Sequence, residues 1–220
     1  MVRVSEIFDS VQGEGILIGV PHTFVRLSGC NLSCRWCDTK YAQAASGKEM
    51  EPTDILKAAG LSHVCVTGGE PLLQDVVGLF KMLSENGKKI TVETNCTMYD
   101  KRLDSFVFLY SVSPKLSSSG ESYKMNVLEN YLKLDNVQIK FVISDDKDFT
   151  EALSIVKKYP EFVRDKAVIL QPDGMCTLPL YQKRLKWLSG KVLGNDVLLR
   201  NNVRVLPQLH KIVWGNKRGV

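Results

Sequence analysis

Several features that would place this 220-residue chain outside the ordinary globular proteins are missing. No apolar run approaches the ~18 residues that a membrane-spanning helix needs. The first ten residues, MVRVSEIFDS, carry Arg3, Glu6 and Asp9 where a secretory signal peptide would be apolar. The sequence has no Pro/Ser-rich linker and no repeat of fixed period. Its content of 44% hydrophobic and 24% charged residues excludes disordered and collagen-like classes. We therefore expect a cytoplasmic protein with one domain over residues 1–220 and no membrane partner.

Acidic residues are absent after Asp196, although the chain has 24 of them against 29 Lys and Arg. The formal net charge of +5 therefore lies in the last part of the chain. The basic residues there are Arg200, Arg204, Lys211, Lys217 and Arg218. Such a tail suits a solvated end, a nucleic-acid contact or a wall around an anionic ligand. Hydrophobic residues are interspersed, so we predict that residues 203–220 form a C-terminal packing segment and make no direct contact with nucleic acid.

Three of the six cysteines, Cys30, Cys34 and Cys37, fall within eight residues in the run CNLSCRWC. Clustered cysteines in a cytosolic protein favour metal over disulfides. No fourth cysteine is near, whereas a closed zinc site commonly has four ligands. Three thiolates suit a four-iron cluster with one iron open to a non-protein ligand. The alternatives are a zinc site completed by His22, His63 or a remote cysteine, and a chance grouping.

Short apolar runs separated by helical patterns predict a parallel α/β sheet. The expected strands are His22–Leu27, His63–Val66, Ile90–Glu93, Phe106–Val112, Val137–Ile143 and Lys166–Leu170. Apolar residues at helical spacing indicate helices over Leu72–Leu83 and Ala152–Tyr159, the first ending near Asn86-Gly87. Thr53 resembles the N-cap of another helix. Six such units predict a partial (β/α)6 barrel, somewhat reduced in helices.

Polar segments follow these strands, at the edge where barrels and open α/β sheets bind ligands. The first strand leads into the cysteine run and the second into Thr67–Pro71. Later strands lead into Glu93–Asn95, Ser113–Lys115 and Gln171–Gly174. Any surface loop is rich in such residues, but five on one rim, one of them with three cysteines, favour a ligand site.

The run CNLSCRWC, with Trp36 as its aromatic residue, resembles the signature of the radical S-adenosylmethionine superfamily, and TGGEP resembles that superfamily's glycine loop. The resemblance implies that Cys30, Cys34 and Cys37 hold a [4Fe–4S] cluster whose open iron binds S-adenosylmethionine. One electron then cleaves this cofactor to methionine and a 5′-deoxyadenosyl radical. The implied cofactor-binding residues are Gly68, Gly69, Glu70, Ser113, Pro114, Lys115, Gln171, Pro172, Asp173 and Gly174.

A narrower resemblance covers most of the chain. EIFDSVQGEG at 6–15, FVRLSGC and CDTKY around the cysteines, and VRVLPQLHKIVWGNKRGV at 203–220 look like the 7-carboxy-7-deazaguanine synthase family. That family converts 6-carboxy-5,6,7,8-tetrahydropterin to 7-carboxy-7-deazaguanine with ring contraction and loss of ammonia, on the route to queuosine and archaeosine in tRNA. The resemblance also implies a homodimer and an electron donor, whose identity the sequence does not reveal.

The family resemblance assigns substrate and magnesium contacts residue by residue. The implied substrate contacts are Val11, Gln12, Gly13, Glu14, Arg26, Thr67 and His210, with Arg26 suited to grip a carboxylate. Whether His210, Lys211 or the chain end reaches the substrate is open. Thr39 matches the family's Mg²⁺ ligand, with Asp38 as the alternative ligand or a loop cap.

Some residues stay outside this assignment. Cys96 stands in ETNCT where the family usually has Gly. His22 and His63 lie in expected strands and are interpreted as structural histidines. Lys140 and the cysteines 65, 96 and 176 receive no role. The competing hypotheses are a glycyl-radical activase of the same superfamily and a non-catalytic zinc or iron–sulfur module.

Overall fold

Nine strands form a single sheet in the order β3-β1-β2-β4-β5-β6-β7-β8-β9. The computed structural model describes every residue except Asn216. The strands are β1 (Val2–Val11), β2 (Pro21–Leu27), β3 (Lys48–Met50), β4 (His63–Gly68), β5 (Lys89–Thr94), β6 (Val107–Val112), β7 (Val137–Ile143), β8 (Val168–Pro172) and β9 (Val203–Val205). From β2 to β9 each neighbour pairs in parallel, whereas β1 pairs antiparallel with both β2 and β3. The sheet is therefore open, with β3 and β9 at its edges.

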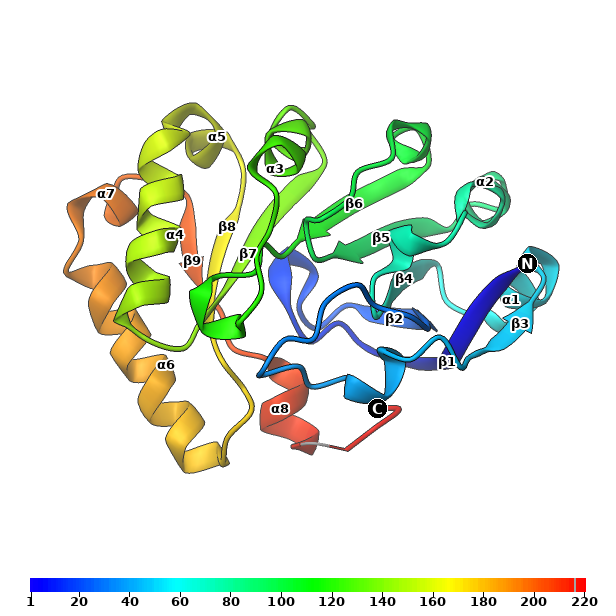
Figure 1. Cartoon of the computed structure of the whole chain (residues 1–220), viewed down its shortest axis with the longest axis horizontal. Coiled ribbons are helices and arrows are strands. Elements are labelled where there is room, and N and C mark those ends of the chain that lie inside the picture. The colour runs from blue at the N-terminus through cyan, green and yellow to red at the C-terminus, as the bar shows by residue number, and fades with distance from the viewer. Residues whose placement is uncertain (216) are drawn as a thin grey trace.

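The helices are α1 (Pro52–Ala58), α2 (Val77–Glu85), α3 (Met125–Leu132), α4 (Asp146–Lys158), α5 (Pro160–Asp165), α6 (Leu178–Leu193), α7 (Asp196–Leu199) and α8 (Leu209–Trp214). Figure 1 shows α2 to α5 along the outer side of the curved sheet, while α8 and the C-terminus lie on the inner side. Only a 3-10 helix, Lys101–Leu103, joins β5 to β6. The predicted partial barrel with reduced helices is confirmed. Within the described residues, no helix is both long and apolar enough to span a bilayer.

The central strands are buried on both faces, as parallel sheets generally are. In β7, Ile139, Phe141 and Ile143 belong to the hydrophobic core. The alternate residues Gln138 and Lys140 are also buried, at 2% and 7% exposure. The polar face of this strand therefore points into the protein, toward the inner side of the barrel. Each fully buried aliphatic side chain on the core face contributes about 1.5–3 kcal/mol.

The structure corrects several predicted strands. β1, β3 and β9 were not predicted, because β1 carries five polar residues and the other two span three residues each. β8 begins at Val168 and ends at Pro172, two residues later than predicted. Gln171 and Pro172 are therefore strand residues. Proline is tolerated at position 172 because it lies beyond the last pair between β8 and β9, Leu170–Val205, so no bond to β9 is lost.

Two helix predictions also change. Thr53 is not an N-cap: Glu51 occupies that position and Pro52 is the first helical residue, where its missing N–H costs nothing. The pattern over Leu72–Leu83 divides into a 3-10 helix, Pro71–Leu73, and α2, because Gln74 is extended. The predicted end of α2 is confirmed, with Asn86 as C-cap and Gly87 at φ 72°.

Candidate active site

A cavity of about 380 Å³ opens at the carboxyl ends of the parallel strands. This volume is in the range of small-molecule sites. Nearly all of the residues predicted to bind the cluster, the cofactor or the substrate line this cavity. They are Val11, Gln12, Gly13, Glu14, Arg26, Cys30, Cys34, Cys37, Thr39, Thr67, Gly68, Gly69, Ser113, Lys115, Gln171, Asp173, Gly174 and His210. Glu70, Pro114 and Pro172 are not among the lining residues.

The cysteine loop follows β2 and is held from the far side of the cavity by two other segments. Asn31 donates from Nδ2 to the hydroxyl of Thr97 (2.9 Å) and accepts from Nδ2 of Asn95 (3.0 Å). Trp36 donates from its indole N–H to the hydroxyl of Ser118 (3.1 Å). The residues after β5 and β6 thus fix the loop, and the three thiols face one cavity.

The three thiols fit a cluster better than a single ion. Among the described residues, no three His, Cys, Asp or Glu side chains converge as ligands of one metal ion. In a four-iron cluster each cysteine binds a different iron, so the thiolates need not meet at a point. Burial raises the pKa of both Cys30 and Cys34, and the neighbouring thiols raise it further, whereas Lys115 lowers it. Lys115 is thus a cation close to the thiols.

His22 and His63 are not among the residues that line this cavity, which agrees with their interpretation as structural histidines. They stand near the starts of β2 and β4, whereas the cysteine loop follows the end of β2. At about 3.3 Å per residue, the length of these strands separates them from the thiols. Their rings instead lie 5.0 Å apart, centroid to centroid. Neither can complete a zinc site with the cysteine run.

The glycine loop after β4 packs directly on the start of the cysteine loop. A Cβ on Gly68 would lie 2.1 Å from the carbonyl oxygen of Leu27, and a Cβ on Gly69 would lie 2.1 Å from that of Gly29. Gly69 donates to the Leu27 carbonyl (3.1 Å) and Glu70 to that of Gly29 (2.9 Å). Only glycine permits this approach, which places both loops on one wall of the cavity.

Glu70, the last residue of the glycine loop before Pro71, turns its side chain into the protein. Its side chain is fully buried, and its carboxylate accepts from the Asn95 amide (2.7 Å), the Leu72 amide (3.1 Å) and the Thr94 hydroxyl (3.0 Å). Burial raises its pKa in spite of these donors. The carboxylate therefore holds the loop after β5 in place and does not face the cavity.

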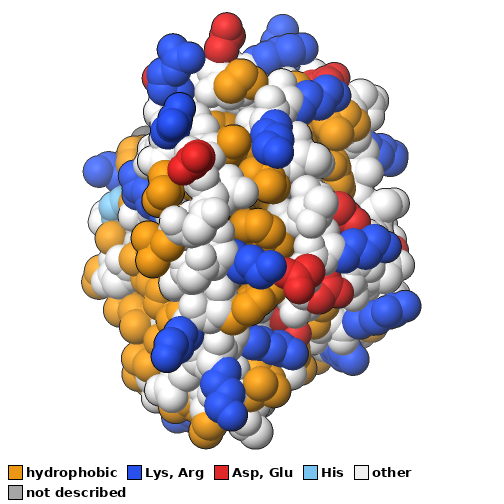
Figure 2. Space-filling model, turned by 90° about the vertical axis from the view of Figure 1, so that its left-hand side faces the viewer, with side chains coloured by type: hydrophobic (Ala, Val, Ile, Leu, Met, Phe, Trp, Pro, Cys, Tyr) orange, Lys and Arg blue, Asp and Glu red, His pale blue; other side chains and the backbone are white. Residues whose placement is uncertain are grey.

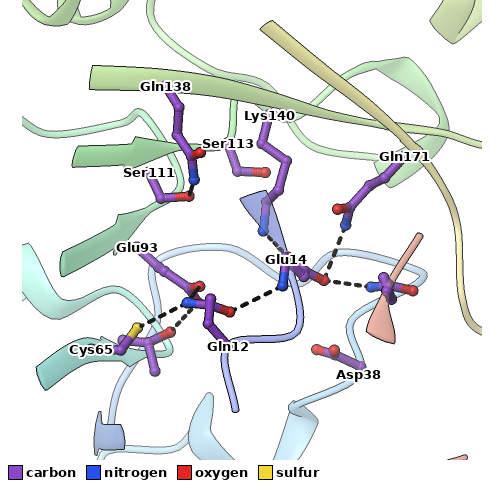
Figure 3. A network of polar contacts seen from close by, with 12 residues as sticks. Gln12, Glu14, Asp38, Cys65, Glu93, Ser111, Ser113, Gln138, Lys140 and Gln171 are labelled. Carbon is purple, nitrogen blue, oxygen red and sulfur yellow. Dashed lines mark hydrogen bonds and ion pairs between the residues drawn. The ribbon is translucent and has the colours of Figure 1, made fainter. Parts of the chain in front are cut away.

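Glu14 is the centre of a buried polar network (Figure 3). Lys140 points from β7 and Gln171 from β8 toward its carboxylate. Lys140 forms an ion pair with Oε2, while Oε1 accepts from Nε2 of Gln171 (3.0 Å) and of Gln208 (2.7 Å). Burial alone would raise the pKa of Glu14, but Lys140, and then His210, hold it well below its ordinary value. The carboxylate is therefore ionised and fixed.

Gln12 and Thr67 lie beside a second carboxylate, that of Glu93. Gln12 donates from Nε2 to Oε1 of Glu93 (3.3 Å), and Thr67 donates its hydroxyl to Oε2 (2.9 Å). The Oε1 of Gln12 accepts from the Glu14 amide (3.1 Å). The register explains this grouping, because Thr67 pairs with Arg26 and follows Val66, the partner of Val92. Amide, hydroxyl and carboxylate groups thus stand side by side on the cavity wall.

Glu93 was expected on the ligand rim but received no role, and Lys140, Gln138 and Gln208 were not predicted to belong to the site. Gln138 accepts from the Ile16 amide (2.8 Å) and donates to the Ser111 hydroxyl (2.8 Å). The sequence did offer a clue to Lys140 and Gln138, because these polar residues alternate with core residues on one strand. Glu93 carried one too, because it ends a strand whose neighbours end in ligand loops. No feature of the sequence by itself pointed to Gln208.

The C-terminal segment closes one side of the cavity. The Leu209 amide donates to the carbonyl of Gly13 (2.8 Å), and His210 lies against that glycine. His210 and Lys211 both line the cavity, as do Lys217, Arg218 and Val220. These residues of the basic tail thus form one wall of the site.

Another part of the cavity carries the residues expected to bind the cofactor. Lys115 donates to the Ser113 hydroxyl (3.0 Å) and lies over the Trp36 ring, 5.4 Å from its centroid. Asp173 accepts from Nη1 of Arg184 (2.8 Å) and from the Met175 amide (2.8 Å). An ammonium beside the cysteine loop suits a carboxylate ligand, and the carboxylate of Asp173 is held in one orientation.

Thr39 lies on the same rim, directly after the cysteine run. Its hydroxyl donates to Oδ1 of Asp38 (2.8 Å), and both residues line the cavity. Two oxygens are thus adjacent here, the hydroxyl of Thr39 and the carboxylate of Asp38.

Comparisons with known proteins agree with this site. Residues 24–117 match the Radical SAM superfamily. A 7-carboxy-7-deazaguanine synthase of Pyrobaculum aerophilum is 39% identical, over 99% of this chain and 97% of the relative. Those of Thermoplasma acidophilum and Bacillus subtilis are each 35% identical, over at least 98% of both chains. The crystal structure of QueE from Escherichia coli covers 95% of this chain and 94% of its own, with a TM-score of 0.68 and 26% identity.

A more distant likeness concerns the fold alone. Streptococcus suis SuiB, in a crystal structure bound to S-adenosylmethionine, covers 84% of this chain at 14% identity with a TM-score of 0.60. The open parallel barrel and the three-cysteine cavity therefore define a radical S-adenosylmethionine enzyme, which carries a [4Fe–4S] cluster and uses S-adenosylmethionine. Its relatives are more specific: the chain belongs to the 7-carboxy-7-deazaguanine synthase family and acts in deazapurine biosynthesis.

Proposed function

We propose that this enzyme converts 6-carboxy-5,6,7,8-tetrahydropterin to 7-carboxy-7-deazaguanine, with ring contraction and release of ammonia, for queuosine or archaeosine in tRNA. The observation that carries the proposal is the array of Gln12, Glu14 and Glu93 in the cavity that also holds the three thiols. An aminopyrimidinone ring presents a donor–acceptor edge, which an amide and carboxylates complement. The proposed product retains that ring, so the same array can hold substrate and product.

The protein's own residues bind and orient the substrate in this proposal. Gln12, Gly13 and Glu14, beside Val11, hold the ring edge, with Thr67 and His210 as further contacts. Arg26, on the cavity face of β2, receives the carboxylate through its guanidinium. Lys140, Gln171 and Gln208 keep Glu14 ionised and immobile, so the ring meets a preformed site.

The cluster is held by Cys30, Cys34 and Cys37, and with S-adenosylmethionine it supplies one-electron radical chemistry when bound. We assign the cofactor's contacts to Gly68, Gly69, Ser113, Lys115, Gln171, Asp173 and Gly174. Support comes from their position on the cavity and from the ammonium of Lys115 close to the thiols. Glu70, Pro114 and Pro172 would act indirectly, by shaping the loops.

Thr39 is proposed as a ligand of Mg²⁺, which keeps several waters and accepts few protein oxygens. Its place on the rim beside the Asp38 carboxylate supports this role. We predict that Thr39→Ala weakens the dependence of activity on magnesium and leaves uncoupled cleavage of S-adenosylmethionine intact. Unchanged magnesium activation would remove Thr39 from the role.

A homodimer, an external electron donor and a cytoplasmic location complete the proposal. Figure 2 shows hydrophobic side chains gathered in the lower part of the α6 face. Leu178 and Leu180 at the start of α6, with Ile212 and Val213 of α8, are 38–54% exposed, which suits a subunit contact.

All six cysteines are free, as a reducing compartment requires. We also propose that the chain is one domain, which the single sheet supports.

The deciding experiment is an anaerobic assay of the cluster-containing protein with reductant, S-adenosylmethionine, Mg²⁺ and 6-carboxytetrahydropterin, read by mass spectrometry. We expect 7-carboxy-7-deazaguanine. Formation of 5′-deoxyadenosine without that product would keep the radical chemistry and refute the substrate. Cys37→Ala is the matched control: it should lose the brown absorption near ~400 nm of thiolate-bound iron and all turnover.

A further inference from the structure

A single carboxylate beside the cavity holds two arginines that line it and come from distant parts of the chain. Glu6 of β1 accepts from Nε of Arg26 through Oε1 (2.8 Å) and from Nε of Arg218 through Oε2 (3.0 Å). Tyr41, in the loop after the cysteines, donates its hydroxyl to the same Oε1 (2.6 Å). Burial, and then this bond to Glu6, raises the pKa of Tyr41 to about 12, so the hydroxyl keeps its proton.

Both arginines are held by Nε, which leaves their terminal nitrogens available. In the described part of the chain, neither guanidinium has a hydrogen bond from its terminal nitrogens to a protein acceptor. Both residues line the cavity. Two guanidiniums share the one carboxylate of Glu6. Asp38, the other carboxylate that acts on Arg26, already accepts from Thr39.

Arg218 is also fixed in place, although its side chain is 55% exposed. Its guanidinium carbon lies 3.8 Å from the centroid of the Tyr41 ring. A stacked guanidinium loses less freedom when it binds a ligand. Glu6 thus binds the Arg218 guanidinium at Nε, and the Tyr41 ring stacks against it. Together they hold Arg218 beside Arg26.

We propose that Arg26 and Arg218 form a two-armed clamp for a ligand carboxylate, and that Glu6 is the positioning residue that sets the arms. The clamp adds Arg218 to the substrate contacts and rests on the proposed function, in which the ligand is the carboxylate of the pterin. Paired arginines bind a carboxylate through charge-assisted hydrogen bonds. These bonds recognise the planar shape of the carboxylate as well as its negative charge.

A second carboxylate enters the same cavity, that of S-adenosylmethionine. Lys115, on the side of the thiols and bonded to Ser113, is better placed for it. The two sources are separated by measuring both ligands with the same variant.

The test is Arg218→Gln in the cluster-containing protein. We expect the KM for 6-carboxytetrahydropterin to rise about tenfold or more, the loss of one charge-assisted contact, with a smaller change in kcat. The KM for S-adenosylmethionine should stay within about twofold. Arg218→Lys should be intermediate, because lysine keeps the charge but cannot bind Glu6 and a ligand with separate nitrogens. Arg164→Gln, at an exposed position of α5, makes the same change in charge and should behave as wild type.

Equilibrium dialysis of 6-carboxypterin and of pterin without the carboxylate makes the test independent of turnover. Arg218→Gln should weaken binding of the carboxylated compound and leave the other unchanged. Equal weakening of both would mean that Arg218 only holds the chain end in place, and a changed KM for S-adenosylmethionine alone would assign the clamp to that cofactor. Either result overturns the proposal. If wild type formed no 7-carboxy-7-deazaguanine, the proposed function would fail, whereas the dialysis comparison would still decide on the clamp.

Discussion

Gly13 and His210 are in such close contact that a Cβ at position 13 would lie 2.2 Å from the Nδ1 atom of the histidine. The residue before His210 extends the contact, because the Leu209 amide donates to the Gly13 carbonyl. Packing against His210 therefore explains why glycine occupies position 13, between Gln12 and Glu14, in addition to its place in the motif. It lets α8 seat against the turn that carries Glu14.

Gly13→Ala should therefore displace His210 and loosen the C-terminal wall. We expect a loss of about 1–3 kcal/mol in the free energy of unfolding, the usual cost of overpacking, together with a raised KM for the pterin. Urea unfolding and steady-state kinetics measure the two effects. Gly78→Ala is the matched control, because this exposed glycine of α2 has nothing within 4 Å of its added Cβ. That change should raise stability by about 0.4–1 kcal/mol; equal losses in both variants would refute the contact.

Removal of Lys140 should destabilise the protein strongly. Lys140→Met leaves the Glu14 carboxylate buried with only amide donors, and breaking a buried pair from one side costs about 3–5 kcal/mol. Glu14→Gln/Lys140→Met should recover a large part of that loss, because no uncompensated charge remains. Urea unfolding of the single and double variants gives the coupling. Lys147→Met, at an exposed position of α4, is expected within about 0.5 kcal/mol of wild type. A double variant as unstable as the sum of its singles would contradict a direct pairing.

Much of the parallel sheet could be predicted from the sequence, because its strands are short apolar runs between helical patterns. β7 was predicted with its observed bounds, Val137–Ile143. β1 could not be predicted in this way, since Glu6, Asp9 and Ser10 interrupt its apolar pattern. The side chain of Glu6 binds residues 26, 41 and 218, which line the cavity. The polar side chain of Glu6 thus serves the site, and it also interrupts the apolar pattern from which β1 could have been predicted.

The site was predictable where a short motif carries it, as in the cysteine run and the glycine loop. The network around Glu14 was not, because its members lie 126 to 194 residues away along the chain. Glu70 shows the opposite failure: a motif residue whose carboxylate caps a neighbouring loop. Only the packing of β4 against β5 shows which way that carboxylate points.

Cys96 should tolerate glycine better than alanine. It is the one non-glycine residue in the described chain with positive φ, 67°, and its side chain is fully buried. That conformation costs an L-residue roughly 1–2 kcal/mol, which glycine does not incur. Cys96→Ala should lower the free energy of unfolding by about 1 kcal/mol, because it removes a buried side-chain atom and keeps the strained conformation. Cys96→Gly relieves that strain and should therefore be at least as stable as Cys96→Ala. At Cys65, in the extended strand β4, the order should reverse. Thermal unfolding of the four variants checks both, and the same order at both positions would contradict the argument.

The His22–His63 pair should make the protein less stable as the pH falls. Burial lowers the pKa of both rings. The hydrogen bond to Val20 and then Glu93 partly oppose this for His22, while His22 and Lys89 reinforce it for His63. His22 donates from Nδ1 to the Val20 carbonyl (2.9 Å), whereas Nε2 of His22 and Nδ1 of His63 are buried without a partner. A proton on either ring would therefore add a buried charge with no acceptor.

The sign of the effect follows from linkage. The unfolded chain binds protons at a histidine pKa near about 6.5, while the folded chain binds them only at lower pH. Stability is therefore fully present above about pH 7.5, falls as the pH drops through 6.5, and levels off below the folded pKa values. His22→Phe should flatten urea midpoints measured at pH 7.5, 6.5 and 5.5, and His22→Phe/His63→Phe should flatten them further. If the double variant kept the wild-type slope, other groups would be responsible for it. A slope that flattened only with His63→Phe would assign the effect to the half-buried ring, which has the easier access to a proton.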